Sequence, residues 1–143
     1  MAFHIQPRKF EPGDYIVREG ERLEEVYFVY HGRDGVGTVG VGPLTMKHGE
    51  EVHKPVLYYK KPMIIGEYAI LMQKPAVTTY RVYEDKTLDV FAVPRRPFMD
   101  LLETYYPEDR DVMLGYSQKK AKHIQDCIEK EMKSMSRSRT FGS

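Results

Sequence analysis

The chain has 143 residues, enough for one domain with a buried core, and a formal net charge of +1. Apolar residues make up 41% and charged residues 30%, a balance typical of a globular protein that gives no overall attraction to nucleic acid. No apolar run approaches the roughly 20 residues of a membrane-spanning helix, and the first residues lack the apolar core of a signal peptide. The single cysteine, Cys127, cannot form an internal disulfide, which fits a reducing cytoplasmic compartment.

Residues 10–93 have the pattern of a β structure. Short runs rich in valine, tyrosine and phenylalanine follow one another at close, regular spacing, with glycine, proline and aspartate between them. The runs are DYIVREGE, EEVYFVYHG, GVGTVGVG, PVLYYKKP and TTYRVYEDKTLDVFAVP. This spacing predicts an antiparallel roll or barrel rather than a parallel sheet with crossover helices. The polar segment PLTMKHGEEVHKP is expected to form an exposed hairpin tip or loop.

The segment IIGEYAILMQKP predicts a turn at Gly66 and then one helical turn from Glu67 to Leu71. Glycine lets a backbone approach a ligand closely, and the free N–H groups at the start of a helix attract an anion. A carboxylate beside a phosphate is unfavourable unless it accepts a hydrogen bond from another group, such as a sugar hydroxyl. The local pattern alone therefore fits an ordinary loop as well as a ligand site.

From Pro94 onward the pattern is helical. A first helix carries apolar residues at helical spacing, namely Phe98, Leu101, Leu102 and Tyr105. A second helix is expected from about Pro107 to about Met135, with acidic residues in its first turn. Its apolar stripe consists of Val112, Met113, Tyr116, Ala121, Ile124, Ile128, Met132 and Met135. We therefore expect one domain over residues 1–136, with a roll at about 8–93, helices at about 95–135 and a flexible basic tail at 137–143.

Four segments follow one another along the chain, FEPGDYIVREGE, VYFVYHG, IGEYAIL and LDVFAVPRRPFMDLLETYYPE. Over roughly residues 8–130, this order resembles the cyclic-nucleotide-binding domain family. This family includes regulatory subunits of cyclic-AMP-dependent kinase, bacterial catabolite activators and cyclic-nucleotide-regulated channels. The resemblance implies a mainly β fold with α, an antiparallel β-roll of jelly-roll type followed by two C-terminal helices, the last one long. Residues 64–80 are similar to the phosphate-binding cassette of the family, which has Phe-Gly-Glu and, further on, Pro-Arg-Ala-Ala-Thr.

The resemblance implies a site for cyclic AMP or cyclic GMP in which Glu67 accepts a hydrogen bond from the ribose 2′-hydroxyl. The arginine that neutralises the phosphate in the family falls on Ala76, so cyclic-nucleotide binding is expected to be weak or lost. Lys74 is a candidate substitute for this cation, although lysine lacks the planar fork of arginine. The expected ligand-binding residues are Ile65, Gly66, Glu67, Tyr68, Ala69, Lys74, Ala76, Val77 and Thr78, with Ile124 and Ile128 on the helix that closes over the ligand.

The segment FMDLLETYYPEDRDVMLGYSQKKAKHI is similar to the end of channel-type domains. The resulting interpretation is a cytoplasmic regulatory domain of a cation channel or transporter, within a larger membrane protein that forms a homo-oligomer. In this interpretation pocket occupancy moves the last helix, and a side chain of the C-terminal helix or tail is a candidate occupant in place of a nucleotide. Two alternatives stay open, a ligand-free structural or interaction module and a domain that responds to a non-cyclic nucleoside.

The residues that could support catalysis or metal binding show no suitable arrangement. His31, His48 and His53 lack metal-ligand spacing, and Cys127 has no nearby cation to activate it. No paired carboxylates or nucleophile with a base stand out. We therefore expect neither an enzyme nor a required cofactor or metal.

Overall fold

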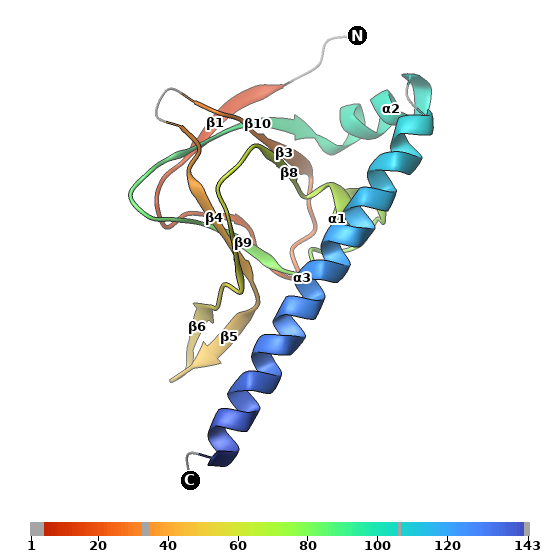
Figure 1. Ribbon diagram of the computed structural model, residues 1–143. Helices are drawn as coiled ribbons and strands as arrows, with labels where there is room; N and C mark the ends of the chain where they lie inside the picture. Colours follow the sequence, from red (N-terminus) through yellow and green to blue (C-terminus); the bar gives the residue numbers. More distant parts are fainter. Residues whose placement is uncertain (1–4, 33–34, 106, 142–143) are drawn as a thin grey trace.

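The computed structural model describes residues 5–32, 35–105 and 107–141, and the side chains of residues 105, 107 and 135–141 lie outside this description. Strands come first and the two longer helices last (Figure 1). The strands are β1 (Gln6–Phe10), β2 (Tyr15–Val17), β3 (Glu25–Val29), β4 (Thr38–Gly42), β5 (Leu44–Lys47), β6 (Glu50–His53), β7 (Leu57–Tyr59), β8 (Met63–Ile65), β9 (Thr79–Tyr83) and β10 (Leu88–Pro94). The helices are α1 (Glu67–Leu71), α2 (Arg95–Tyr105) and α3 (Pro107–Phe141).

Two antiparallel four-stranded sheets form the roll. Their strand orders are β1-β10-β3-β8 and β2-β9-β4-β7, and the short helix α1 lies between β8 and β9 in the chain. The strands β5 and β6 pair with each other and project from the roll as a hairpin (Figure 1). His48 and Gly49 both have positive φ, 54° and 79°, which suits the tight turn of a hairpin. The predicted roll and hairpin are thus confirmed.

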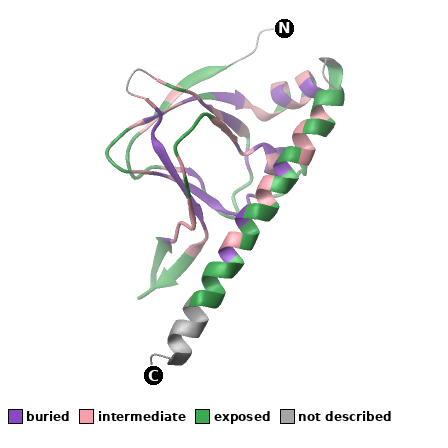
Figure 2. Ribbon diagram, in the orientation of Figure 1, coloured by how far each residue is buried: buried purple, intermediate pink, exposed green. Residues whose placement is uncertain are grey.

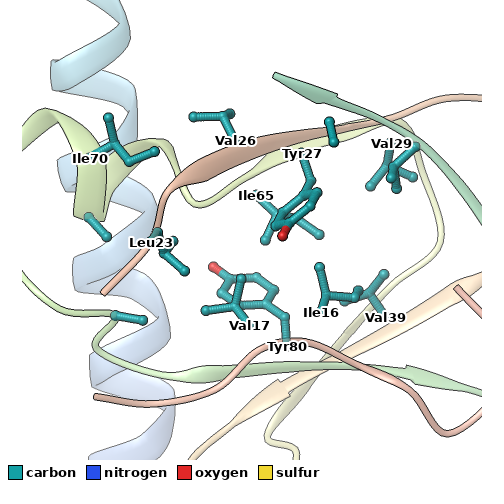
Figure 3. Close-up of a cluster of buried hydrophobic side chains, with 14 of the residues drawn as sticks. Ile16, Val17, Leu23, Val26, Tyr27, Val29, Val39, Ile65, Ile70 and Tyr80 are labelled. Carbon is teal, nitrogen blue, oxygen red and sulfur yellow. The ribbon is translucent and has the colours of Figure 1, made fainter. Parts of the chain in front are cut away.

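The core lies between the inner faces of the two sheets (Figure 3). Valines from both sheets are almost fully buried, and Ile65 at the end of β8 is 0% exposed. Leu23 and Ile70 lie at the end of the core where α1 and α3 are found (Figure 3). The alternation of apolar and polar residues along the strands therefore supplies one continuous core, and this core holds α1 in place.

Helix α2 packs on the roll through the residues predicted for it. Phe98 and Leu102 are buried, and the Phe98 ring meets Phe28 of β3 edge to face with centroids 6.3 Å apart. Leu101 is partly buried, whereas the predicted contact of Tyr105 lies outside the described side chains. The chain then turns into α3, which begins at Pro107 as predicted.

Helix α3 differs from the prediction in its end and in its apolar stripe. It continues to Phe141, beyond the predicted end at about Met135, and no proline or glycine interrupts residues 136–141. Met113, Ala121, Ile124 and Ile128 face the roll or are partly buried, but three apolar members are exposed. These three are Val112, Tyr116 and Met132, at 59%, 72% and 61% exposure. The helix meets the roll along a narrow line, so one side of it stays uncovered (Figure 2).

His53 anchors the base of the projecting hairpin. Its Nδ1 lies 2.8 Å from the Tyr83 hydroxyl, and its ring contacts the rings of Tyr15 and Tyr83. Burial, the largest cause, lowers the pKa of His53 below its ordinary value of 6.5, and the positive charge of Arg81 adds to this effect. The folded protein therefore holds this ring neutral at a pH where an unfolded chain would protonate it.

We expect acidification to lower the free energy of unfolding through His53. The contribution of His53 should be fully present above about pH 6.5 and should fall as the pH drops below this value, by at most about 1.4 kcal/mol per pH unit. Urea unfolding at a series of pH values, compared between wild type and His53→Gln, measures this contribution. His31→Gln is the matched control, because His31 is exposed. An identical pH dependence in wild type and His53→Gln would show that His53 is not responsible.

Candidate ligand pocket

Gly66 places the first residue of α1 at the mouth of the roll. It has φ 96° and ψ −6°, a left-handed conformation that glycine adopts without strain. A Cβ at this position would lie 2.9 Å from the Leu23 side chain, so the chain passes close to its neighbour here. The turn at Gly66 directs the Glu67 side chain toward α3.

Glu67 is the centre of a buried polar network that joins α1 to α3. Its side chain is only 5% exposed, and its Oε1 accepts a hydrogen bond from Ser117 Oγ at 3.1 Å and forms an ion pair with Lys120 Nζ at 2.8 Å. Lys120 also donates to the carbonyl oxygen of Ile64, again at 2.8 Å. A buried carboxylate is stable only when donors or a cation satisfy it, and here both come from α3.

The space beside this network is small. It is lined by Val17, Leu23, Gly66, Glu67, Tyr68, Ala69, Ala76, Val77, Thr78, Tyr80, Ser117, Lys120, Ala121 and Ile124. Its volume is about 40 Å³, whereas pockets that bury drug-sized ligands measure about 300–1,000 Å³. With α3 in this position, the pocket is therefore filled by side chains of the protein itself.

Besides Glu67, Ser117 and Lys120, the polar side chains of the pocket lining are Tyr68, Thr78 and Tyr80. The Thr78 Oγ1 atom is buried and has no hydrogen-bond partner among the described residues. Burial and the nearby charge of Glu67 raise the pKa of Tyr80, so its hydroxyl stays protonated. Ala76 is held by two backbone hydrogen bonds, from its N–H to Glu21 O and from Gly20 N–H to its own carbonyl. Within the described lining, Lys120 is the only basic side chain.

Comparison with known proteins agrees with this architecture and decides the family. The family described as "Cyclic nucleotide-binding domain" matches residues 7–105. The chain belongs to this family. The segment that resembles the family's cassette runs from β8 through α1 to Thr78, and residues of α3 complete the lining of the pocket.

Two curated relatives are potassium channels. Potassium channel KOR1 of Oryza sativa subsp. japonica is 26% identical over 118 residues, and potassium channel SKOR of Arabidopsis thaliana is 26% identical over 113 residues. The alignments cover 82% and 79% of this chain but only 13% and 12% of the two channels. The chain therefore corresponds to a small part of these relatives.

Two solved structures share the fold. The catabolite activator protein of Thermus thermophilus has a TM-score of 0.60 at 18% identity, over 85% of this chain and 54% of that one. The regulatory domain of Toxoplasma gondii PKA, crystallised with cAMP, has a TM-score of 0.59 at 17% identity, over 80% of this chain and 39% of that one. At these identities the likeness concerns the fold alone.

The structure brings most of the predicted ligand-binding residues together. Seven of them line the pocket, namely Gly66, Glu67, Tyr68, Ala69, Ala76, Val77 and Thr78. Ile124 of the lid helix lines it as well, while Ile128 is buried further along α3. Ile65 lies in the core instead of the lining, and Lys74 is exposed, with its ammonium 4.7 Å from the centre of the Tyr68 ring. Lys74 does not supply a cation to the pocket in this structure.

The sequence interpretation missed Ser117 and Lys120. Together with Ala121 and Ile124 they follow the spacing of one helix face, which is the signal that could have revealed them. The neighbouring lysines of the basic run KKAKH, Lys119 and Lys122, are exposed. Across the described ranges, no group of three or more potential metal ligands occurs, and no described helix is long and apolar enough to cross a membrane.

Proposed function

We propose that this chain is the regulatory domain of a cation channel or transporter, in which α3 fills the pocket and shifts its position when a ligand enters. The observation that carries this proposal is the pairing of the buried Glu67 with Ser117 and Lys120 of α3. The two potassium channels among the relatives support the choice of parent protein. In such a parent the domain would lie on the cytoplasmic side and would join the homo-oligomer that the channel forms.

The mechanism is a shift between two positions of α3. In the docked position, Ser117, Lys120 and Ile124 close the pocket, and about 40 Å³ remains. A ligand that enters must move these side chains, so ligand binding and a shift of α3 are linked. The ligand can bias the helix only by its difference in affinity for the two positions. The movement of α3 is then passed to the segments of the parent that adjoin this domain.

Cyclic nucleotides are expected to bind weakly. The cassette presents Ala76 where a cation would face the phosphate, and a nucleotide must also break the contacts of Glu67 with α3. Removal of one partner of a desolvated charge pair costs about 2–5 kcal/mol, or roughly thirtyfold to several thousandfold in affinity. A site of micromolar affinity would thus become one of about millimolar affinity.

The filled pocket also favours a second candidate function. If no diffusible ligand displaces α3, the domain is a structural or interaction module in which the Glu67 network fixes the long helix. A buried pair of this kind can select one conformation without adding much stability. The two candidates differ in whether any small molecule stabilises the domain.

A thermal unfolding screen separates them. Cyclic AMP, cyclic GMP, adenosine and guanosine are each added at about 0.1–10 mM. A regulatory domain should gain stability with concentration, by about 2.7 kcal/mol when the ligand reaches 100 times its dissociation constant. Glu67→Ala removes the ribose acceptor and should abolish the gain, whereas Tyr116→Ala, an exposed residue of α3, should leave it intact. No gain with any of the four compounds would favour the structural module.

A further inference from the structure

The charged groups of the pocket belong to two parts of the molecule. Glu67 is carried by α1 on the roll, and Lys120 is carried by α3, 53 residues further along the chain by the difference of their numbers. Within the described lining these are the only charged side chains. The net charge of the pocket therefore depends on where α3 lies.

With α3 docked, the opposite charges of Glu67 and Lys120 balance at 2.8 Å. With α3 withdrawn, the pocket keeps the carboxylate of Glu67 and has no cation in its lining, because Ala76 offers none. A cyclic nucleotide carries a negative phosphate, and two like charges in a poorly solvated site repel each other strongly. An open pocket of this composition would reject the ligand of the family.

Lys120 is able to face both the carboxylate and a ligand. Its ammonium has three N–H donors. Among the described residues it contacts two acceptors, Glu67 Oε1 and Ile64 O. Its side chain is 26% exposed, so it is not sealed behind the network. It also lines an outer groove between α3 and the β7–β8 segment. The Lys120 side chain therefore borders both this groove and the pocket.

We propose that Lys120 decides whether this pocket accepts an anion, so that α3 itself delivers the cation that an entering phosphate requires. This inference rests on the proposed coupling between α3 and the pocket. On binding, Lys120 exchanges Glu67 for the phosphate, and Glu67 exchanges Lys120 for a hydroxyl of the ligand. Both buried charges then keep a partner, which requires a ligand with an anionic group and a hydroxyl donor together.

The test is a titration of labelled protein with cyclic AMP and cyclic GMP up to about 20 mM, followed by NMR on the amides of α1. Lys120→Met should weaken binding about tenfold or more, and Lys120→Arg should keep it within about threefold. The matched control is Lys119→Met, which removes a charge from the exposed neighbour outside the pocket lining. Tighter binding of the cyclic nucleotide by Lys120→Met would mean that Lys120 only blocks the pocket, which would overturn the proposal. The absence of binding by wild type at about 20 mM would overturn it as well.

A second variant keeps the test valid if Lys120→Met unfolds. Glu67→Gln leaves the cation in a pocket without its carboxylate, so inorganic phosphate should bind several times more tightly than to wild type. This gain should vanish in Glu67→Gln/Lys120→Met, and its persistence there would contradict the role of Lys120. A different result would overturn the proposed function alone. In that case, Lys120→Met would still weaken ligand binding, but ligand binding would leave the hydrogen exchange of α3 unchanged.

Discussion

Ala76→Arg is expected to tighten the binding of cyclic AMP or cyclic GMP tenfold or more. Ala76 lines the pocket, and its backbone is fixed by hydrogen bonds to Glu21 and Gly20, so a longer side chain there starts from a defined position. An arginine would supply a phosphate partner on the roll itself, and a desolvated pair of this kind is worth about 2–5 kcal/mol. Calorimetric titration of both proteins measures the change.

The control for this prediction is Ala76→Gln, which adds length and hydrogen-bonding capacity without charge. It should leave the affinity within about threefold of wild type. The docked position of α3 leaves only about 40 Å³, so the arginine also competes with Lys120 for Glu67 in the absence of ligand. Unchanged affinity in Ala76→Arg would mean that the cassette does not bind a cyclic phosphate even when a cation is present.

Loss of the Lys120 ammonium is expected to destabilise the domain markedly, because Glu67 remains buried. Breaking a fully buried ion pair costs about 3–5 kcal/mol, and the partial exposure of Lys120 lowers our expectation for Lys120→Met to about 1–3 kcal/mol. Glu67→Gln/Lys120→Met should regain at least half of this loss, since the amide needs no counter-ion. Urea unfolding of wild type, both single variants and the double variant gives the coupling energy.

Simple additivity in this double-mutant cycle would contradict the pairing of Glu67 with Lys120 in solution. Lys119→Met serves as the control, because this exposed lysine lies outside the lining and should change the free energy of unfolding by less than about 0.5 kcal/mol. A loss of similar size in both lysine variants would point to a general effect of charge on α3 instead.

Much of the fold could be predicted because local chemistry determines it. The His48-Gly49 pair suits a hairpin turn, glycine and proline separate the strands, and Pro107 starts the last helix. The exposure of Val112 and Tyr116 could not be predicted in this way. Helical spacing identifies an apolar stripe, but the contact line between α3 and the roll decides which members of the stripe are covered.

Only the part of the site that lies on the roll could be predicted from the sequence. Residues 66–69 and 76–78 belong to one cassette, so their sequence resemblance placed them together. Ser117 is separated from Glu67 by 50 positions, and nothing local indicates this contact. Lys120 was missed because its neighbours are exposed lysines, and a charged run more often faces solvent than a buried carboxylate. The sequence indicated that Ala76 lacks the cation of the family, but it did not indicate that α3 brings another cation, Lys120, to the pocket.

Hydrogen exchange along α3 tests the central claim, that this helix occupies the pocket and shifts its position when a ligand binds. Residues 117–128 are the informative segment, because they include the pocket contacts, while residues 129–134 are exposed. We predict that amides from Ile124 onward exchange much faster than those of β3, and that the exchange of residues 117–128 changes when cyclic AMP is added at millimolar concentration. Protection equal to that of β3 throughout residues 117–128, unaltered by cyclic AMP, cyclic GMP or adenosine, would contradict the account.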